Sequence, residues 1–178
     1  MKRILALTIT LVIVATVLTG CGKTQNKTST SNQVIRATIA SEPKTLDPSR
    51  NNAVDGGNYI LCAFEGLTTL GKDGTIVAGT AERWETSDDG LVWTFYIRKD
   101  AKWSDGKDVT ANDFVYSWRR LVDPATAADY AYYAYFIKNG EKINAGEADV
   151  STLGVRAVND KTLEVTLESP CPFFTEIV

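Results

Sequence analysis

The chain has 178 residues, of which 44% are hydrophobic and 23% charged, and its net charge is −3 at pH 7. That length is enough for one hydrophobic core, and the composition is that of a folded protein rather than a disordered one. The acidic balance argues against a nucleic-acid partner, because phosphates attract clustered lysine and arginine side chains. The sequence contains no histidine, which removes the commonest general base and the commonest zinc ligand. We therefore expect no catalytic activity, no metal site and no cofactor.

The first residues have the pattern of an export signal. Lys2 and Arg3 precede residues 4–20, an uncharged apolar stretch that is short for a bilayer span. The run LTGC at residues 18–21 resembles the bacterial lipobox, in which the cysteine becomes the lipidated N-terminus. We predict a signal peptide at residues 1–20, and lipidated Cys21 with a flexible linker at residues 21–33. The alternative is a single N-terminal transmembrane anchor.

The next predicted elements are a strand, a helix and a hairpin. Residues 34–39 are predicted as a strand. Asp55 is predicted to cap a helix that runs through Phe64, with Gly66 as its C-terminal stop. Residues 67–70 and 75–77 flank the turn sequence GKDG and are predicted to pair.

Residues 81–122 combine a strand, a turn, a second strand, a polar bend and a helix. Residues 92–99 alternate between two faces, which predicts a strand with Trp93, Phe95 and Ile97 on one side. Thr110 and Asp113 have the spacing of a capping box, and apolar residues at helical spacing follow them. The Asp-Pro pair at residues 123–124 ends this predicted helix.

The remaining sequence predicts a helical aromatic patch over residues 130–136, a short helix between Gly140 and Gly146, and a hairpin of residues 153–158 and 163–167. A last helix is predicted to open at residues 170–174. Four tryptophans, at positions 84, 93, 103 and 118, are predicted to pack in the core or the hairpins. Cys62 and Cys171 could pair outside the cytoplasm, but their contexts favour two free thiols.

Four segments resemble a known family: SEPKTLDP (41–48), FEGL (64–67), AERWETSDDGLVWTFYIRKDAKWSDGKDVTANDFVYSW (81–118) and LGVRAVNDKTLEVTLESPCPFF (153–174). In this order they resemble the solute-binding lipoproteins of bacterial oligopeptide and dipeptide ABC transporters, extracellular solute-binding protein family 5. The resemblance implies a mixed α/β (α+β) fold of the class II periplasmic-binding-protein type. It implies an N-terminal fragment, with residues 34–65 as the start of lobe I and residues 66–178 as most of a small α+β domain, truncated.

The resemblance also implies a function and a site. It indicates a monomeric, lipid-anchored receptor on the outer face of the cell membrane, which would be the periplasmic side in a Gram-negative cell. Such a receptor captures oligopeptides and delivers them to ABC importer permease subunits. The positions that match the family's peptide contacts are Asn52, Ala53, Val54 and Tyr130. In some relatives a carboxylate occupies the position of Asn52, so a charged contact from this segment is not expected here.

Three alternatives remain open at the level of sequence. The fold also occurs in binding proteins for nickel complexes, haem or sugars. A truncated, non-binding remnant is a second alternative. A surface hydrolase is the third, disfavoured because the sequence has no histidine and no nucleophile motif. The residues of the predicted site also have a simpler reading, as a loop before a helix and a tyrosine packed among its aromatic neighbours.

Overall fold

A computed structural model describes residues 36–38 and 41–178 of this chain. The chain divides into two units, residues 1–38 and 39–178, and the fold described below is that of the second unit. The predicted signal peptide, Cys21 and the linker lie outside the described residues, as does most of the predicted strand at 34–39; residues 36–38 have no regular secondary structure. In the part of the chain that the structure describes, no helix is both long and apolar enough to cross a membrane.

Helix α2 (Val54–Ala63) is the predicted helix, but its ends are set differently from the prediction. It begins after Ala53, whose backbone is extended, and Asp55 lies in the first turn instead of capping it. The carboxylate of Asp55 accepts a hydrogen bond from the hydroxyl of Ser41. The helix ends because Phe64 turns extended, so Gly66 is not its stop. Strands β1 (Thr68–Leu70) and β2 (Ile76–Ala78) then form the predicted antiparallel hairpin.

A four-stranded antiparallel sheet forms the centre of the unit, with the order β3-β4-β6-β5. Its strands are β3 (Ala81–Thr86), β4 (Val92–Ile97), β5 (Val155–Asn159) and β6 (Thr162–Thr166). Strand β4 is central, and its alternation places Trp93, Phe95 and Ile97 in the core, as predicted. The predicted hairpin near the end of the chain is β5–β6, which pairs with β4 through β6.

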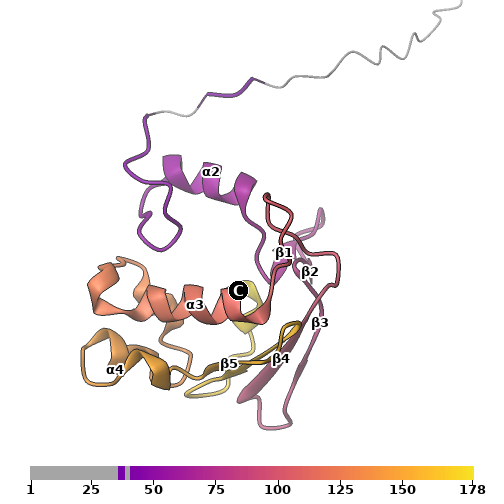
Figure 1. The fold of residues 1–178 in the computed structure, drawn as a ribbon, viewed down its shortest axis with the longest axis vertical. Helices are drawn as coiled ribbons and strands as arrows, with labels where there is room; N and C mark the ends of the chain where they lie inside the picture. Colours follow the sequence, from indigo (N-terminus) through magenta and orange to yellow (C-terminus); the bar gives the residue numbers. More distant parts are fainter. Residues whose placement is uncertain (1–35, 39–40) are drawn as a thin grey trace, which may run out of the picture. The chain divides into compact units, whose positions relative to one another are not determined.

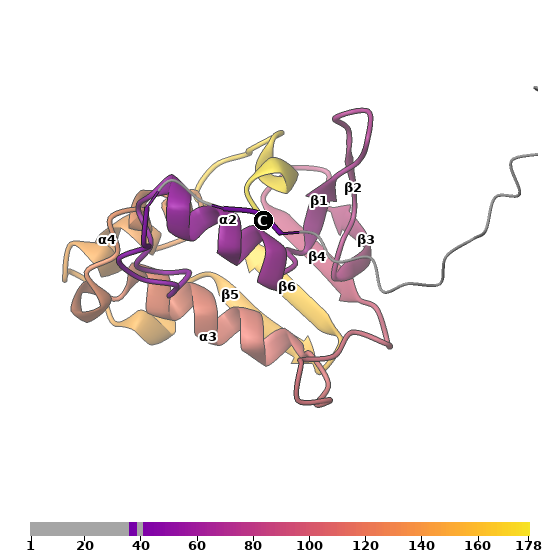
Figure 2. The same cartoon turned by 90° about the horizontal axis from the view of Figure 1, so that it is seen from above.

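Helix α3 (Ala111–Val122) covers the sheet over β5 and β6 (Figures 1 and 2). The predicted capping box is present: the N–H and the hydroxyl of Thr110 lie 2.7 and 3.0 Å from Oδ2 of Asp113. Ala111, Val115 and Val122 are buried against the sheet. Asp123 ends the helix, as predicted, and its side chain caps the short turn η1 (Pro124–Thr126).

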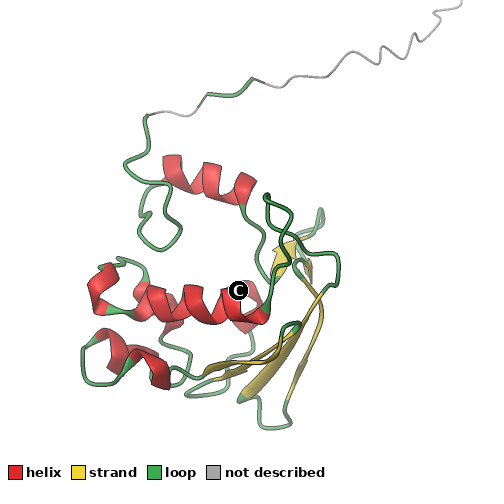
Figure 3. Ribbon diagram, viewed as in Figure 1, coloured by secondary structure: helices red, strands yellow, loops and turns green. Residues whose placement is uncertain are grey.

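Several short helical turns, joined by loops, follow α3 (Figure 3). The predicted short helix is α4 (Gly140–Asn144), and η3 (Val150–Thr152) precedes β5. Two predicted helices are shorter than expected. The aromatic patch forms only the 3₁₀ turn η2 (Ala131–Ala134), and the last predicted helix is the single 3₁₀ turn η4 (Phe174–Glu176). In η4, Phe174 is 1% exposed and packs on Trp93 and Phe95, with ring centroids 5.7 and 6.2 Å away.

The four tryptophans, Cys62 and Cys171 differ in how deeply they are buried. Trp93 is buried, and Trp84 and Trp118 pack partly buried against the core. The prediction was wrong for Trp103, which is 41% exposed because it belongs to the bend before α3; its indole N–H donates to Asp113 over 3.3 Å. Cys62 is exposed and Cys171 is buried, and both thiols are free, as favoured from their contexts. The mixed α and β fold expected from the sequence is confirmed.

Candidate functional site

The loop that precedes α2 carries two of the four predicted site residues, Asn52 and Ala53, and a third, Val54, is the first residue of α2. The loop starts with a turn organised by Asp47, whose carbonyl accepts hydrogen bonds from the N–H groups of Arg50 and Asn51, at 3.0 and 2.9 Å. The Asp47 side chain accepts a third bond from the N–H of Ser49 over 3.0 Å. Aspartate before proline favours such a turn, because its carboxylate can bond to the backbone two residues on. The sequence Leu-Asp-Pro therefore builds a compact turn.

Helix α2 approaches this turn closely at Gly56. A Cβ atom at Gly56 would lie 2.1 Å from Oδ1 of Asn51 and 2.7 Å from the carbonyl oxygen of Thr45, so only glycine fits there. The amide of Asn51 also donates to the carbonyl of Ala53 over 2.9 Å. The turn and the first turn of the helix are thus fixed to each other.

An ion pair fixes the same turn to α3. The guanidinium of Arg120 donates two hydrogen bonds to the carboxylate of Asp47, over 2.7 and 2.5 Å. Both side chains are partly buried, 33% and 27% exposed. The bonds from Arg120 lower the pKa of Asp47, against the opposing effect of burial, so the carboxylate is ionised at neutral pH. Two parallel bonds define position and orientation better than one.

A second contact joins the far end of the loop to the segment after α3. The side-chain amide of Asn52 donates to the carboxylate of Asp129. The next residue, Tyr130, is 42% exposed, and its ring lies edge-on to the rings of Tyr132 and Tyr133, with both centroids 5.9 Å away. The structure thus brings Asn52 and Tyr130, predicted from separate segments, to neighbouring positions.

The backbone of the loop is extended and open where it meets α2. Ala53 has φ −125° and ψ 147°, which is strand geometry. Among residues 36–38 and 41–178, nothing hydrogen-bonds to the N–H or C=O of Asn52 or to the N–H of Ala53. Asn52 and Val54 are exposed, Val54 by 78%. An extended, exposed backbone with free donors and acceptors can pair with another extended chain.

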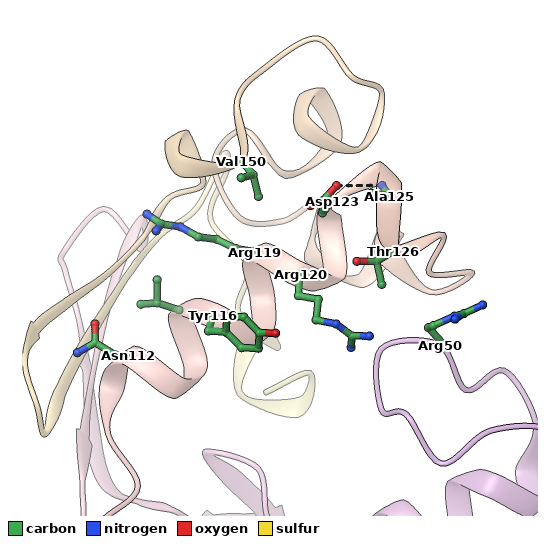
Figure 4. A pocket seen from close by; sticks show the side chains of 10 residues that line it. Arg50, Asn112, Tyr116, Arg119, Arg120, Asp123, Ala125, Thr126 and Val150 are labelled. Carbon is green, nitrogen blue, oxygen red and sulfur yellow. Dashed lines mark hydrogen bonds between the residues drawn. The ribbon is translucent and has the colours of Figure 1, made fainter.

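A groove of about 660 Å³ lies beside the ion pair, between the loop and the outer face of α3 (Figure 4). Arg50 lines it from the loop, and Tyr116, Arg119 and Arg120 line it from α3. Arg119 donates to the carbonyl of Ser151 over 3.1 Å. None of the four predicted site residues lines this groove, so it is separate from the open backbone at Asn52.

The sequence indicated the loop and the tyrosine but not what holds them. Asp47 and Arg120 are 73 residues apart, and Asn52 and Asp129 are 77 apart. No local pattern links such positions, so neither pair was predicted. The one available signal was the Leu-Asp-Pro turn, which placed Asp47 in an ordered segment without naming its partner.

Comparison with known proteins identifies the family. The model of the bacterial extracellular solute-binding proteins, family 5 (middle region), matches residues 75–178, more than half of the chain. The chain belongs to this family. The expected membership and fold class are therefore confirmed, and relatives within solute-binding protein family 5 can be compared with this chain.

Three relatives show what this family 5 chain is similar to. It is 42% identical to the oligopeptide-binding protein OppA of Bacillus subtilis, over 89% of this chain and 29% of that protein. It is 45% identical to the probable deoxycholate-binding periplasmic protein YgiS of Escherichia coli, over 82% of this chain and 28% of that protein. The structure of Listeria monocytogenes OppA bound to peptide superposes with a TM-score of 0.73 at 47% identity, covering 74% of this chain and 26% of that one. The chain thus spans less than a third of the length of these relatives.

Proposed function

We propose that this chain is part of the substrate-binding lipoprotein of a peptide ABC importer. The observation that carries the proposal is the open, extended backbone at Asn52 and Ala53, next to the exposed ring of Tyr130. A peptide pairs with such a backbone as an added strand, so its main chain supplies affinity whatever its side chains are. The similarity to oligopeptide-binding proteins, one of them solved with peptide, supports this ligand class.

In this proposal Asn52, Ala53 and Val54 contact the peptide main chain, and Tyr130 contacts the ligand with its ring. The Asn52 side chain already donates to Asp129, so its backbone groups are the ones available to a peptide. No step of chemistry is proposed: the protein binds and releases, and no cofactor takes part.

The proposal includes the domain plan. Residues 34–65 would open lobe I, and residues 66–178 would form most of the small α+β domain. Helix α2 supports this plan, because Gly56 is its only buried residue, while Val54 and Leu61 are 78% and 80% exposed. Exposed apolar side chains in such number mark a surface that packs against other protein, which in this plan is the remainder of lobe I.

The proposal also includes the location and the partners. Signal peptide 1–20 would be removed, Cys21 would carry the lipid, and residues 21–33 would tether a monomer at the outer face of the membrane. The permease subunits of an ABC importer would receive the peptide. Growth with labelled palmitate tests the anchor: wild type should take up label and stay with the membrane, whereas Cys21→Ser should not. Equal labelling of both would refute the lipid at Cys21.

Peptide binding is tested by titration calorimetry on the natural gene product that carries these residues, with a mixture of peptides of two to five residues. Ala53→Pro removes the N–H donor of the open backbone and also forces φ of this residue from −125° toward about −65°, so it should weaken binding by at least about tenfold, the equivalent of one lost backbone hydrogen bond. Lys72→Pro is the matched control, because Lys72 occupies the second position of the Gly71–Gly74 turn, where proline is favoured. Equal affinity for both variants would refute pairing at Ala53. Peptides recovered intact after incubation would exclude the hydrolase alternative.

A ligand other than peptide is the second candidate, favoured by the 45% identity to the probable deoxycholate-binding protein. Titration with sodium deoxycholate distinguishes the two. Binding of deoxycholate without peptide binding would overturn the peptide proposal in favour of this candidate. A flat titration with both would leave the non-binding remnant as the better account.

A further inference from the structure

Two polar contacts hold the loop at residues 47–54 against the rest of the unit, one near each end. At its start the Asp47 carboxylate accepts two hydrogen bonds from Arg120 on α3. At its other end the Asn52 amide donates to Asp129, beside Tyr130. The two anchors are only five residues apart along the loop, so the backbone between them has little freedom.

The loop between the anchors is stiff as well. Three N–H groups bond back to Asp47, and the Asn51 amide spans to the carbonyl of Ala53. The backbone of Gly56, in the first turn of α2, packs directly against the side chain of Asn51. A displacement of Asp47 is therefore transmitted to Asn52 and Ala53 and is not absorbed within the turn.

We propose that Arg120 and Asp129 are positioning residues for peptide binding: acting through Asp47 and Asn52, they hold the open backbone of Asn52 and Ala53 where a ligand can pair with it and contact Tyr130. This inference rests on the proposed function. A backbone held in its binding geometry loses little conformational freedom when it pairs, so pre-organisation raises affinity without a further contact to the ligand. Where only a fraction of molecules has the loop in place, the apparent affinity falls by that fraction.

The geometry favours an arginine at position 120. Its planar fork bonds to both carboxylate oxygens at once, which sets the angle of the Asp47 side chain as well as its distance. A lysine would keep the charge but make a single, rotatable contact. Arg120→Lys therefore separates orientation from charge.

The chain offers a matched control. Arg156 on β5 also makes a two-pronged pair with a carboxylate, Nε and Nη2 lying 2.6 and 2.9 Å from the oxygens of Glu164 on β6. That pair joins two adjacent strands and contacts no part of the loop. Its removal reports what the loss of any partly exposed arginine–carboxylate pair does to this protein.

The experiment compares wild type with Arg120→Ala, Arg120→Lys, Asp129→Ala and Arg156→Ala in the natural gene product. Calorimetry with the peptide mixture gives the affinity, and amide hydrogen exchange at Ser49, Arg50, Asn51 and Gly57, whose N–H groups are hydrogen-bonded, gives the order of the loop. We expect Arg120→Ala and Asp129→Ala each to weaken binding about tenfold and to speed exchange in the loop, with Arg120→Lys in between. We expect Arg156→Ala to change neither by more than about twofold.

Each other outcome counts against the inference. Faster loop exchange with unchanged peptide affinity would show that Arg120 and Asp129 order the loop without contributing to peptide binding. An equal loss of affinity in Arg156→Ala would show a general loss of stability. Full binding in Arg120→Ala, with a loop as ordered as in wild type, would show that the pair is dispensable. A wild-type protein that binds no peptide would refute the proposed function itself, and exchange in the loop would still report whether the anchors order it.

Discussion

Replacing Phe174 by alanine should loosen the central sheet far more than replacing its neighbour Phe173. Phe174 is 1% exposed and lies on the rings of Trp93 and Phe95, whereas Phe173 is 47% exposed and touches Phe136 at the surface. Full burial of one phenylalanine side chain contributes about 1.5–3 kcal/mol. Two aromatic pairs add roughly 0.5–1.5 kcal/mol each. The sum agrees with the roughly 3–5 kcal/mol measured for buried Phe→Ala substitutions in general.

Native-state hydrogen exchange of the β4 amides provides the assay, because it reports the free energy of opening this sheet whether or not other parts unfold with it. We expect Phe174→Ala to lower that free energy by about 3–5 kcal/mol, and Phe173→Ala by less than about 1 kcal/mol. If the two variants loosened β4 equally, the packing of Phe174 on Trp93 and Phe95 would not stabilise the sheet, and the turn η4 would not be part of the core.

Three further predictions follow from the geometry. Thr110→Ala should lower the free energy of unfolding by about 1 kcal/mol in urea titrations, because it removes the Thr110 side chain that accepts from the N–H of Asp113 in the capping box; no change would mean that Asp113 alone caps α3. The hydrogen bonds from Arg120 hold the pKa of Asp47 below its ordinary value of 3.8, so the stabilisation is complete above that pH and is lost as pH falls through the lowered pKa. Asp47→Asn should therefore melt below wild type at neutral pH, with a gap that narrows below pH 3.8 and closes as pH falls through the lowered pKa of Asp47; a gap that does not narrow below pH 3.8 would contradict the ionic contribution. A thiol reagent should label exposed Cys62 in the native protein, but not Cys171, whose pKa is raised by burial, until the protein unfolds; early labelling of Cys171 would contradict its burial.

The sequence predicted best those elements whose signals are local. Period-2 alternation identified β4 and grouped Trp93, Phe95 and Ile97 on one face, and the spacing of Thr110 and Asp113 identified the start of α3. These patterns need no knowledge of the rest of the chain, because each is set by strand geometry or by the unpaired N–H groups of a helix. Turn residues placed both hairpins for the same reason.

The predictions failed where a distant contact decides the local structure. Asp55 has the chemistry of a helix cap, but its carboxylate bonds to Ser41, and the N-cap is Ala53, two residues earlier, so that the helix starts at Val54. The aromatic patch was expected to be helical, but only the turn η2 forms: Ala131 and Ala134 are buried, while the rings of Tyr132 and Tyr133 stack on each other and remain about half exposed. Trp103 was expected to pack in the core or a hairpin because it lies in a structured segment, but it is 41% exposed in the bend before α3.

The candidate site depends on local sequence signals and on distant contacts. Its residues could therefore be named from the sequence, whereas its three-dimensional arrangement could not. Asn52 and Tyr130 were selected because their positions match the peptide contacts of the family that the chain resembles, which requires no knowledge of their surroundings. Their proximity depends on Asp129, and the position of the loop depends on Asp47 and Arg120. The hydrogen bonds within the loop define its turn, but its position against the rest of the unit is set by distant side chains that reach it. For this chain those side chains are charged and paired one to one, so single substitutions at Arg120 and Asp129 can separate the shape of the loop from the stability of the sheet below it.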